Sequence, residues 1–198
     1  MNKIDGFFTP DASAFARSYI EYLQTVLQRL DLEEIASFIE TLLAARSRGS
    51  TVFFIGNGGS AADSQHLAAE LVGRYSVDRR PLRSVALTTD SSVLTCIAND
   101  VSYDEVFARQ TEALVDLGDV LVAISTSGES RNILGALQVA KRKGAGTVAL
   151  LGKGGGSAGS AADYVLIVDS DSTSRIQEAH ILIGHIFCEI VELELNLA

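Results

Sequence analysis

The fold is decided by the stretch Thr51-Val-Phe-Phe-Ile-Gly-Asn-Gly-Gly-Ser-Ala-Ala-Asp-Ser-Gln-His-Leu-Ala-Ala-Glu-Leu71, whose composition changes twice. Its first five residues are mostly β-branched or aromatic, which is typical of a buried strand, and Gly56 to Ser60 form a glycine-rich turn. The residues from Ala61 to Leu71 are mostly helix formers. The pattern therefore predicts a strand, a turn and a helix, whose free N-terminal N–H groups can bind an anion.

An imidazole and a carboxylate follow this turn on the same predicted helix. His66 and Glu70 are four residues apart, so they share one helix face with Cβ atoms roughly 5–6 Å apart. Taken alone, such a pair is more often a surface pair than a pair of ligands or catalytic groups. Its position just beyond an anion-binding turn indicates chemistry.

Length and composition predict a single ordered globular domain over residues 1–198. Hydrophobic residues make up 47% of the chain and charged residues 21%. We expect a cytoplasmic protein that does not enter a membrane, because no apolar run reaches about 18 residues and residues 1–10 lack a signal pattern. The formal charge of −9 argues against nonspecific nucleic-acid binding, but it does not exclude a small anionic ligand. Cys96 and Cys188 form no Cys-x-x-Cys motif and are expected to be free thiols.

Two helices are expected before the first strand, within residues 1–48. Apolar residues recur at near-helical spacing over residues 11–30 and again over 31–45, where Asp31 can cap the second helix. A minimal α/β domain does not need this helical pair. We expect it to pack on a partner subunit; the alternative is ordinary packing within one subunit.

Residues 51–198 are predicted to form the α/β core. Short apolar strands are expected at residues 84–87, 120–124, 147–151 and 164–168, with helices at 92–97, 104–114, 131–143 and 174–196. Residues 152–159 read as a glycine-rich loop. Apolar strands that alternate with helices indicate a three-layer α/β/α sandwich with a five-stranded parallel sheet, flavodoxin-like in type. Ligands of such sheets bind at the carboxyl ends of the strands.

A second anion site is predicted where the strand at 120–124 meets the next helix. The segment Ser125-Thr-Ser-Gly-Glu-Ser130 offers four hydroxyls and the amides of a helix N-terminus, which suit a phosphate monoester. Helix capping and turn chemistry would explain one or two of these residues, but not all four. The segment lacks the Gly-Lys-Ser/Thr of a nucleotide P-loop, and Gly56–Ser60 does not match the dinucleotide fingerprint.

The last helix carries further candidate ligands, Gln177, His180 and His185. Gln177 and His185 are separated by about 12 Å of helix rise, whereas Gln177 and His180 are one turn apart. Spacing therefore does not choose between the two histidines, and His185 in its apolar surroundings could also be a core histidine. Gly184 indicates close packing against another helix or a ligand.

Four motifs in this order give the chain a family resemblance. They are Gly-Asn-Gly-Gly-Ser60 with Asp63-x-x-His66-x-x-x-Glu70-Leu71, then Asn99-Asp100, then Ser125–Ser130, and finally Arg175-Ile-Gln-Glu-x-His180 with His185. Together they span nearly the whole chain. In these motifs the chain resembles the phosphoheptose isomerase family, within the sugar isomerase (SIS) superfamily.

The resemblance implies a role for each site residue. Contacts to the sugar are implied for Asn57, Gly58, Gly59, Glu70, Asn99, Asp100 and Gln177, and contacts to the phosphate for Ser125, Thr126, Ser127 and Ser130. One Zn²⁺ per subunit is implied, held by His66, Glu70, Gln177 and His185. Glu70 and His185 are also the implied acid–base pair, which selects His185 over His180. The family implies a homotetramer with active sites at subunit interfaces.

The implied reaction converts sedoheptulose 7-phosphate to D-glycero-D-manno-heptose 7-phosphate, the first step toward the nucleotide-activated (ADP or GDP) heptose of lipopolysaccharide. We expect Glu70 to transfer the carbon-bound proton through an enediol and His185 to transfer the oxygen-bound proton. Zinc would polarise the carbonyl, although a metal-bound Glu70 would be a weaker base.

Two rival functions remain from the sequence. One is a non-catalytic SIS-domain binding protein, such as one that tethers the replication initiator. The other is an isomerase of another phosphosugar. The complete set of His66, Glu70, Gln177 and His185 favours an enzyme.

Overall fold

The computed structural model describes residues 11–197, which begin with two helices. Helix α1 spans Ala12–Leu27 and α2 spans Leu32–Ser47. Each begins after an aspartate whose carboxylate accepts two N–H groups of the first turn, Asp11 for α1 and Asp31 for α2. The predicted cap at Asp31 is therefore confirmed. Residues 1–10, on which the prediction of no signal pattern rests, lie outside the described residues.

The predicted five-stranded parallel sheet is confirmed. Its strands are β1 (Val52–Gly56), β2 (Ser84–Ala86), β3 (Val120–Ser125), β4 (Gly146–Gly152) and β5 (Tyr164–Val168). Their spatial order is β2-β1-β3-β4-β5, and every neighbouring pair is parallel. This is the flavodoxin-type order, in which the chain reverses direction across the sheet between β1 and β3.

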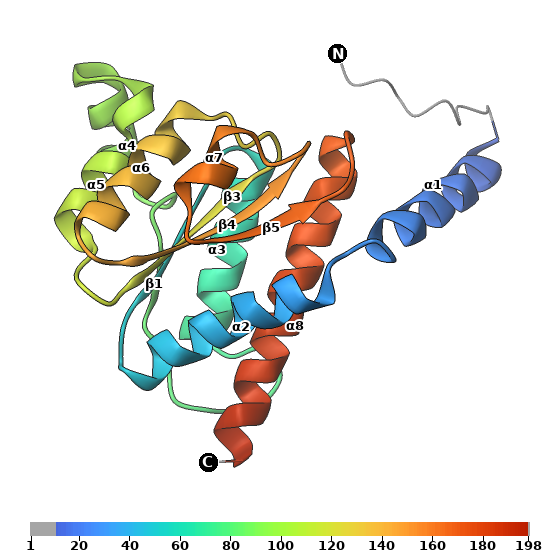
Figure 1. The fold of residues 1–198 in the computed structure, drawn as a ribbon, viewed down its shortest axis with the longest axis horizontal. Helices are drawn as coiled ribbons and strands as arrows, with labels where there is room; N and C mark the ends of the chain where they lie inside the picture. Colours follow the sequence, from blue (N-terminus) through green and yellow to red (C-terminus); the bar gives the residue numbers. More distant parts are fainter. Residues whose placement is uncertain (1–10, 198) are drawn as a thin grey trace.

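The remaining helices connect the strands (Figure 1). They are α3 (Gly59–Val72), α4 (Ser91–Asp100), the 3₁₀ turn η1 (Tyr103–Glu105), α5 (Ala108–Leu114), α6 (Arg131–Arg142), α7 (Gly156–Ala161) and α8 (Thr173–Leu197). Among the described residues, no helix has both the length and the apolar character needed to cross a membrane.

Two predicted segments need correction. The glycine-rich stretch 152–159 is not only a loop, because α7 begins at Gly156. The single helix predicted over 104–114 is split into η1 and α5. Helix α4 ends at Asn99 and Asp100, as expected, so these two residues lie in its last turn.

The central strands β1, β3 and β4 bury both of their faces, as predicted for a parallel sheet. The edge strands β2 and β5 leave some side chains exposed. Phe54 and Val122 contribute to one core cluster, which α2, α3 and α8 cover. Phe53 and Leu121, one position earlier on the same strands, belong to the other cluster, which is formed with α4, α6 and α7. This alternation produces the predicted three layers.

The two N-terminal helices differ in their packing. Helix α2 belongs to the body of this subunit, where Phe38 packs on Phe187 of α8 with ring centroids 5.8 Å apart. Helix α1 extends away from the three layers, and only Val26 of it is buried (Figure 1). Packing within one subunit therefore describes α2, whereas α1 exposes most of its surface.

Helices α3 and α8 lie against each other and run in the same direction. A Cβ atom on Gly59 would lie 2.3 Å from Nε2 of Gln177, and a Cβ atom on Gly184 would lie 2.5 Å from Cδ2 of Leu67. One glycine on each helix thus permits a close approach at two levels. Gly184 is confirmed as a site of close helix packing.

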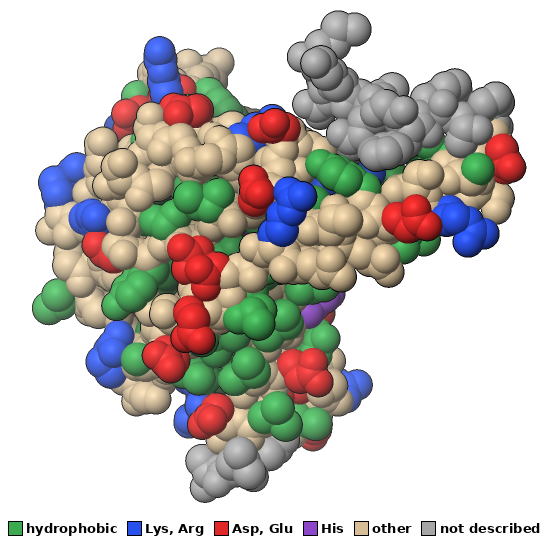
Figure 2. Space-filling view, turned by 45° about the vertical axis from the view of Figure 1, so that its right-hand side comes forward, with side chains coloured by type: hydrophobic (Ala, Val, Ile, Leu, Met, Phe, Trp, Pro, Cys, Tyr) green, Lys and Arg blue, Asp and Glu red, His purple; other side chains and the backbone are tan. Residues whose placement is uncertain are grey.

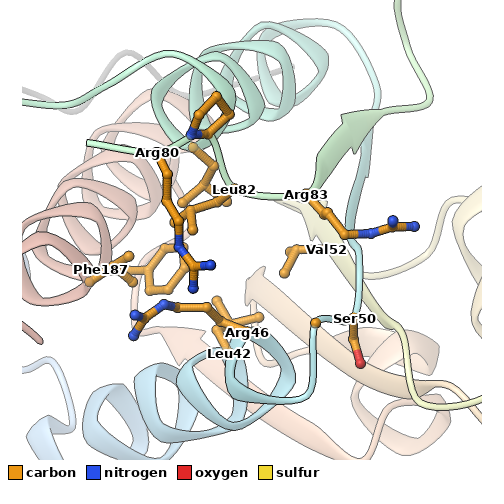
Figure 3. Close-up of a pocket in the computed structure, with 12 residues that line it drawn as sticks. Leu42, Arg46, Ser50, Val52, Arg80, Leu82, Arg83 and Phe187 are labelled. Atoms are coloured by element: carbon orange, nitrogen blue, oxygen red, sulfur yellow. The ribbon is translucent and has the colours of Figure 1, made fainter. Parts of the chain in front are cut away.

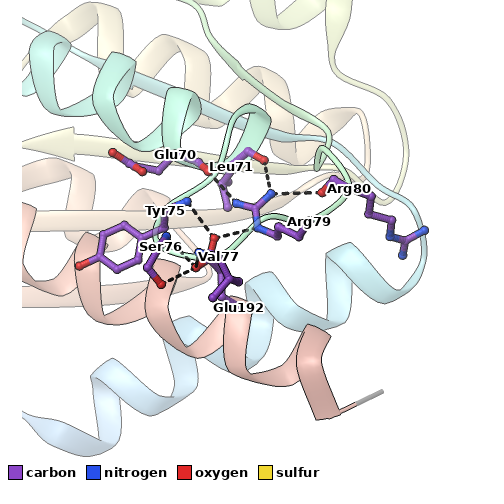
Figure 4. A network of polar contacts seen from close by, with 8 residues as sticks. All are labelled: Glu70, Leu71, Tyr75, Ser76, Val77, Arg79, Arg80 and Glu192. Atoms are coloured by element: carbon purple, nitrogen blue, oxygen red, sulfur yellow. Dashed lines mark hydrogen bonds and ion pairs between the residues drawn. The ribbon is translucent and has the colours of Figure 1, made fainter.

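Glu192 of α8 anchors the segment that follows α3 (Figure 4). Its side chain is 2% exposed and accepts hydrogen bonds from the backbone N–H groups of Tyr75, Ser76 and Val77 at 2.8, 2.8 and 3.0 Å. It also accepts one from Nε of Arg79 at 3.1 Å. Arg79 in turn donates to carbonyl oxygens in the last turn of α3.

These contacts change the acidity of Glu192. Burial by itself raises the pKa of this carboxyl, but the hydrogen bonds from Ser76, Tyr75 and Val77 outweigh it and lower the pKa to about 2. A folded-state pKa below the unfolded value of about 4.3 stabilises the protein above that value. This contribution is lost as the pH falls from about 4.3 toward 2.

Glu192→Gln should therefore lower stability at pH 7, by on the order of 3 kcal/mol, because it leaves Arg79 as a buried charge without its partner. Below about pH 5 the variant should lose less further stability than the wild type. Urea unfolding at pH steps from 7 to 3 measures both effects. Glu40→Gln, at an exposed position of α2, is the control with wild-type behaviour. An unchanged acid dependence in Glu192→Gln would contradict the assignment.

Candidate active site

Two loops meet where the sheet order reverses. One follows β1 and carries Asn57 to Ser60; the other follows β3 and carries Thr126 to Ser130. Together with Thr173 and Gln177 of α8 they line a hollow of ≈ 290 Å³. The structure therefore brings together eight predicted site residues: Asn57, Gly58, Gly59, Ser125, Thr126, Ser127, Ser130 and Gln177.

A second hollow lies at the opposite end of β1 (Figure 3). It measures ≈ 120 Å³ and is lined by apolar residues, including Leu42 and Phe187, and by Arg46, Arg80 and Arg83. None of the predicted site residues lines it. Because parallel sheets bind ligands at the carboxyl ends of their strands, the candidate site is the first hollow.

The loop after β3 uses part of its hydroxyls to hold its own shape. The Oγ of Ser125 accepts the N–H of Gly128 at 3.1 Å, and the Oγ of Ser127 accepts that of Glu129 at 3.2 Å. Ser130 is the N-cap residue of α6, yet its side chain caps no N–H group there. Hydrogen bonds within the loop therefore account for the hydroxyls of Ser125 and Ser127. The Ser130 hydroxyl makes no such capping bond.

The turn before α7 supports this loop from outside. Gly128 has a φ of 66°, and a Cβ atom on it would lie 2.0 Å from the carbonyl oxygen of Gly155. The carboxylate of Glu129 accepts the N–H of Ser157 at 2.9 Å and its hydroxyl at 2.8 Å. No sequence pattern pointed to Glu129, because a single glutamate in a loop carries no signal of its partner.

The second group of candidates gathers along α3 and α8. Nε2 of His66 lies 2.9 Å from Nε2 of His185, and 3.6 Å from Oε1 of Glu70. The ring of Tyr75 packs on His185 with centroids 5.7 Å apart. The His66 side chain is 45% exposed, and Figure 2 shows histidine surface beneath the arm formed by α1. The two ring nitrogens are within hydrogen-bond distance, and the tautomers decide which imidazole donates its N–H to the other.

His180 is separated from this group. It is fully buried, and its Nε2 lies 3.0 Å from the carbonyl oxygen of Leu151 in β4, to which it donates. Burial lowers the pKa of this imidazole to about 4, although the bond to Leu151 opposes the shift. His180 is therefore a neutral core residue, and His185 is the histidine of α8 that faces His66.

Three of the four expected zinc ligands lie together, namely His66, Glu70 and His185. Gln177 lies against Gly59, about 12 Å of helix rise from His185. Across residues 11–197, no three His, Cys, Asp or Glu side chains are close enough to hold a metal ion as they stand.

The donor types nevertheless suit zinc, which binds imidazole nitrogens and carboxylate oxygens. Two nitrogens bound to a tetrahedral zinc ion are about 3.3 Å apart. The two Nε2 atoms, at 2.9 Å, would need to separate only slightly. His66, Glu70 and His185 therefore fit zinc in chemistry, and Gln177 does not reach them in this arrangement.

Asn99 and Asp100 do not line the hollow. The Nδ2 of Asn99 donates to Oδ1 of Asp100 at 2.7 Å, and Sγ of Cys96 contacts Oδ2 of Asp100 at 3.5 Å. Both residues are exposed in the last turn of α4.

Asp63 of α3 has a buried carboxyl oxygen and interacts electrostatically with His66. Its Oδ2 makes no hydrogen bond with the described residues. Burial raises the pKa of Asp63 to about 6, and the charge of His66 opposes this shift. Asp63 stands one turn before His66 within the quoted motif, so only its spacing in that motif could have indicated it.

Comparisons with known proteins agree on one family. The model of the SIS domain matches residues 14–152. A phosphoheptose isomerase from Sulfurimonas denitrificans is 52% identical over 176 residues, which cover 88% of this chain and 90% of the relative. One from Geobacter sulfurreducens is 53% identical over 173 residues, covering 86% and 92%.

A solved structure is similar along nearly its whole length. The phosphoheptose isomerase from Neisseria gonorrhoeae superposes with a TM-score of 0.82 at 39% identity. The match covers 91% of this chain and 96% of that one.

Gly128→Ala should distort the loop after β3, because the new Cβ would clash with the backbone of Gly155. Thermal unfolding should show a loss of about 2–4 kcal/mol, the sum of left-handed backbone strain and overpacking. Gly154→Ala is the matched control: its φ is 77° but no atom lies within 4 Å of the added Cβ. Equal losses in the two variants would show that the contact with Gly155 does not matter.

Proposed function

The chain belongs to the phosphoheptose isomerases of the SIS domain family, and we propose that it converts sedoheptulose 7-phosphate to D-glycero-D-manno-heptose 7-phosphate with Glu70 and His185 as proton carriers. The function is isomerisation of this phosphosugar in heptose biosynthesis. The residue assignment rests on the contact between α3 and α8, where both parts of the proposed site lie. Gly59 of α3 and Gln177 of α8 line the hollow beside the hydroxyl-rich loop after β3. His66 and His185 meet farther along the same two helices.

The distance between these two groups suits the substrate. From Gly59, which lines the hollow, to His66 the helix rises about 10 Å, and from Gln177 to His185 about 12 Å. An extended seven-carbon sugar phosphate spans roughly 10 Å from phosphorus to C1, since each carbon advances about 1.3 Å. A phosphate bound in the hollow would therefore leave C1 and C2 near Glu70 and His185.

Binding of the phosphate rests on hydroxyls and on the start of α6. Ser130 at the N-cap and the amides of the first turn offer donors, and the helix dipole favours negative charge there. This arrangement explains how a chain of net charge −9 can bind a phosphate without a lysine in the loop. The binding energy holds the reacting carbons in place rather than acting on them directly.

The reaction moves one proton between two carbons and another between two oxygens. We assign the carbon proton to Glu70, which removes it from C1 of the ketose and returns it to C2 through an enediol. We assign the oxygen proton to His185, which transfers it from O1 to O2. The contact with His66 gives His185 a neighbour with which to exchange a proton.

Zinc is part of the proposal. His66, Glu70 and His185 would hold it, and when bound it would polarise the carbonyl as a Lewis acid. Gln177, the fourth ligand that the resemblance implies, lies against Gly59 and would have to move toward the other three to bind. Glu70 then has two candidate roles, base and ligand. The homotetramer with sites at subunit interfaces also belongs to the proposal, supported by the exposed face of α1. The free thiols of Cys96 and Cys188 agree with the proposed cytoplasmic location.

A binding protein of the same superfamily is the rival. It would need the fold and the phosphate loop, which is the proposed phosphate-binding loop after β3 (Thr126 to Ser130). It would not need an imidazole pair with an adjacent carboxylate. The three side chains at α3 and α8 therefore favour an enzyme.

Glu70→Gln should keep the fold and substrate binding but lower kcat by about 10²–10⁴-fold, because the amide cannot accept the carbon proton. Steady-state kinetics and isothermal titration with sedoheptulose 7-phosphate separate the two effects. Glu40→Gln is the control. Undiminished turnover in Glu70→Gln would exclude this residue as the base.

Removal of divalent metal tests the zinc assignment. Chelation followed by dialysis should abolish most of the turnover, and added Zn²⁺ should restore it. Elemental analysis should find bound zinc in the wild type and much less in His66→Ala. Full activity in protein shown to be free of metal would contradict the zinc site while leaving the isomerase in place.

A further inference from the structure

The side chain of Asn57 is held by three hydrogen bonds. Its Oδ1 accepts the Nδ2–H of Asn132 at 2.9 Å and the hydroxyl of Tyr103 at 2.9 Å. Its own Nδ2 donates to Oδ1 of Asn132 at 2.9 Å. Two amides and a phenol from three different segments therefore meet beside the candidate site, since Asn57 lines the hollow.

Asn132 is an unusual residue for its position. It lies in the first turn of α6, two residues after Ser130, and it is 2% exposed. A buried amide is costly unless its polar atoms are paired, and Asn57 supplies that pairing. The contact ties the loop after β1 to the helix that carries the phosphate loop.

Tyr103 contacts Asn57 from a third segment of the chain. It belongs to η1, just beyond Asn99 and Asp100, and its side chain is 59% exposed. Asp104 of the same turn lies 3.7 Å from Arg131 of α6, although this exposed ion pair contributes little. The hydroxyl of Tyr103 thus donates to Oδ1 of Asn57, which already accepts one hydrogen bond from Asn132.

We propose that Asn132 and Tyr103 are positioning residues that fix the Asn57 amide so that it presents an N–H donor to a hydroxyl oxygen of the phosphosugar. The two lone pairs of Oδ1 are taken, and one hydrogen of Nδ2 is used by Asn132. The second hydrogen of Nδ2 has no hydrogen-bond partner among the described residues. Because Asn57 lines the hollow that we assign to the phosphosugar, this hydrogen is available to a hydroxyl oxygen of the ligand. This inference rests on the proposed function for the identity of the ligand.

The test is a double-mutant cycle on the isomerisation of sedoheptulose 7-phosphate. Tyr103→Phe should raise KM about 3- to 10-fold with kcat nearly unchanged, and Asn132→Ala should raise it about 10-fold or more. In an Asn57→Ala background neither substitution should change KM further, because both act through Asn57. Asn57→Asp, which replaces the N–H donor by an acceptor, should raise KM at least as much as Asn57→Ala.

Two controls separate positioning from general stability. Gln110→Ala removes another buried amide, bonded to the carbonyls of Leu87 and Val106, and should lower the Tm without changing KM. Tyr164→Phe removes an exposed phenol on β5 and should change neither. If Asn132→Ala does not fold, Tyr103→Phe carries the cycle alone, because Tyr103 is largely exposed.

The proposal is overturned if Tyr103→Phe leaves KM unchanged, or if its effect persists in the Asn57→Ala background. Absence of turnover in the wild type would instead reject the proposed function. In that case the coupling of Asn57 and Asn132 is measured by comparing the Tm of the two single variants and the double variant without ligand. Additive losses in Tm would overturn the positioning as well.

Discussion

The close contact between α3 and α8 holds the two halves of the site in one place. Gly59 admits the side chain of Gln177 at the start of the contact, and Gly184 admits Leu67 farther along. Because the helices run in the same direction, His66 meets His185 at the second level, while the phosphate loop lies beside the first. A Cβ atom at Gly184 would meet the buried side chain of Leu67, so a larger residue there would disturb the packing that brings the imidazoles together. At Gly59 the end of the Gln177 side chain would have to move.

Much of the fold could be predicted because its signals are local. The strand from Val52, the cap at Asp31 and the alternation of apolar strands with helices are each set by neighbouring residues. Helix α7 was missed because its six residues are glycine, serine and alanine, which carry no apolar period. Its start is held by Glu129, a residue far away in the sequence.

The part of the site formed by loops at the strand ends could be predicted from the sequence. The part that depends on contacts between side chains of different helices and loops could not. The loops after β1 and β3 had to lie together once the sheet was parallel. Spacing could not choose between His180 and His185, because the choice depends on how α8 is rotated against α3 and β4. Nor could it show Asn132 and Tyr103 at Asn57, since a buried amide and an exposed phenol have no pattern in the sequence.

This chain isomerises a phosphosugar, and we propose that it does so by proton transfer. The most direct measurement is NMR of sedoheptulose 7-phosphate incubated with the purified protein in D₂O. We expect D-glycero-D-manno-heptose 7-phosphate to appear, with deuterium at C2 to the extent that the carboxylate exchanges the proton with solvent before returning it. Absence of the aldose would contradict the isomerisation.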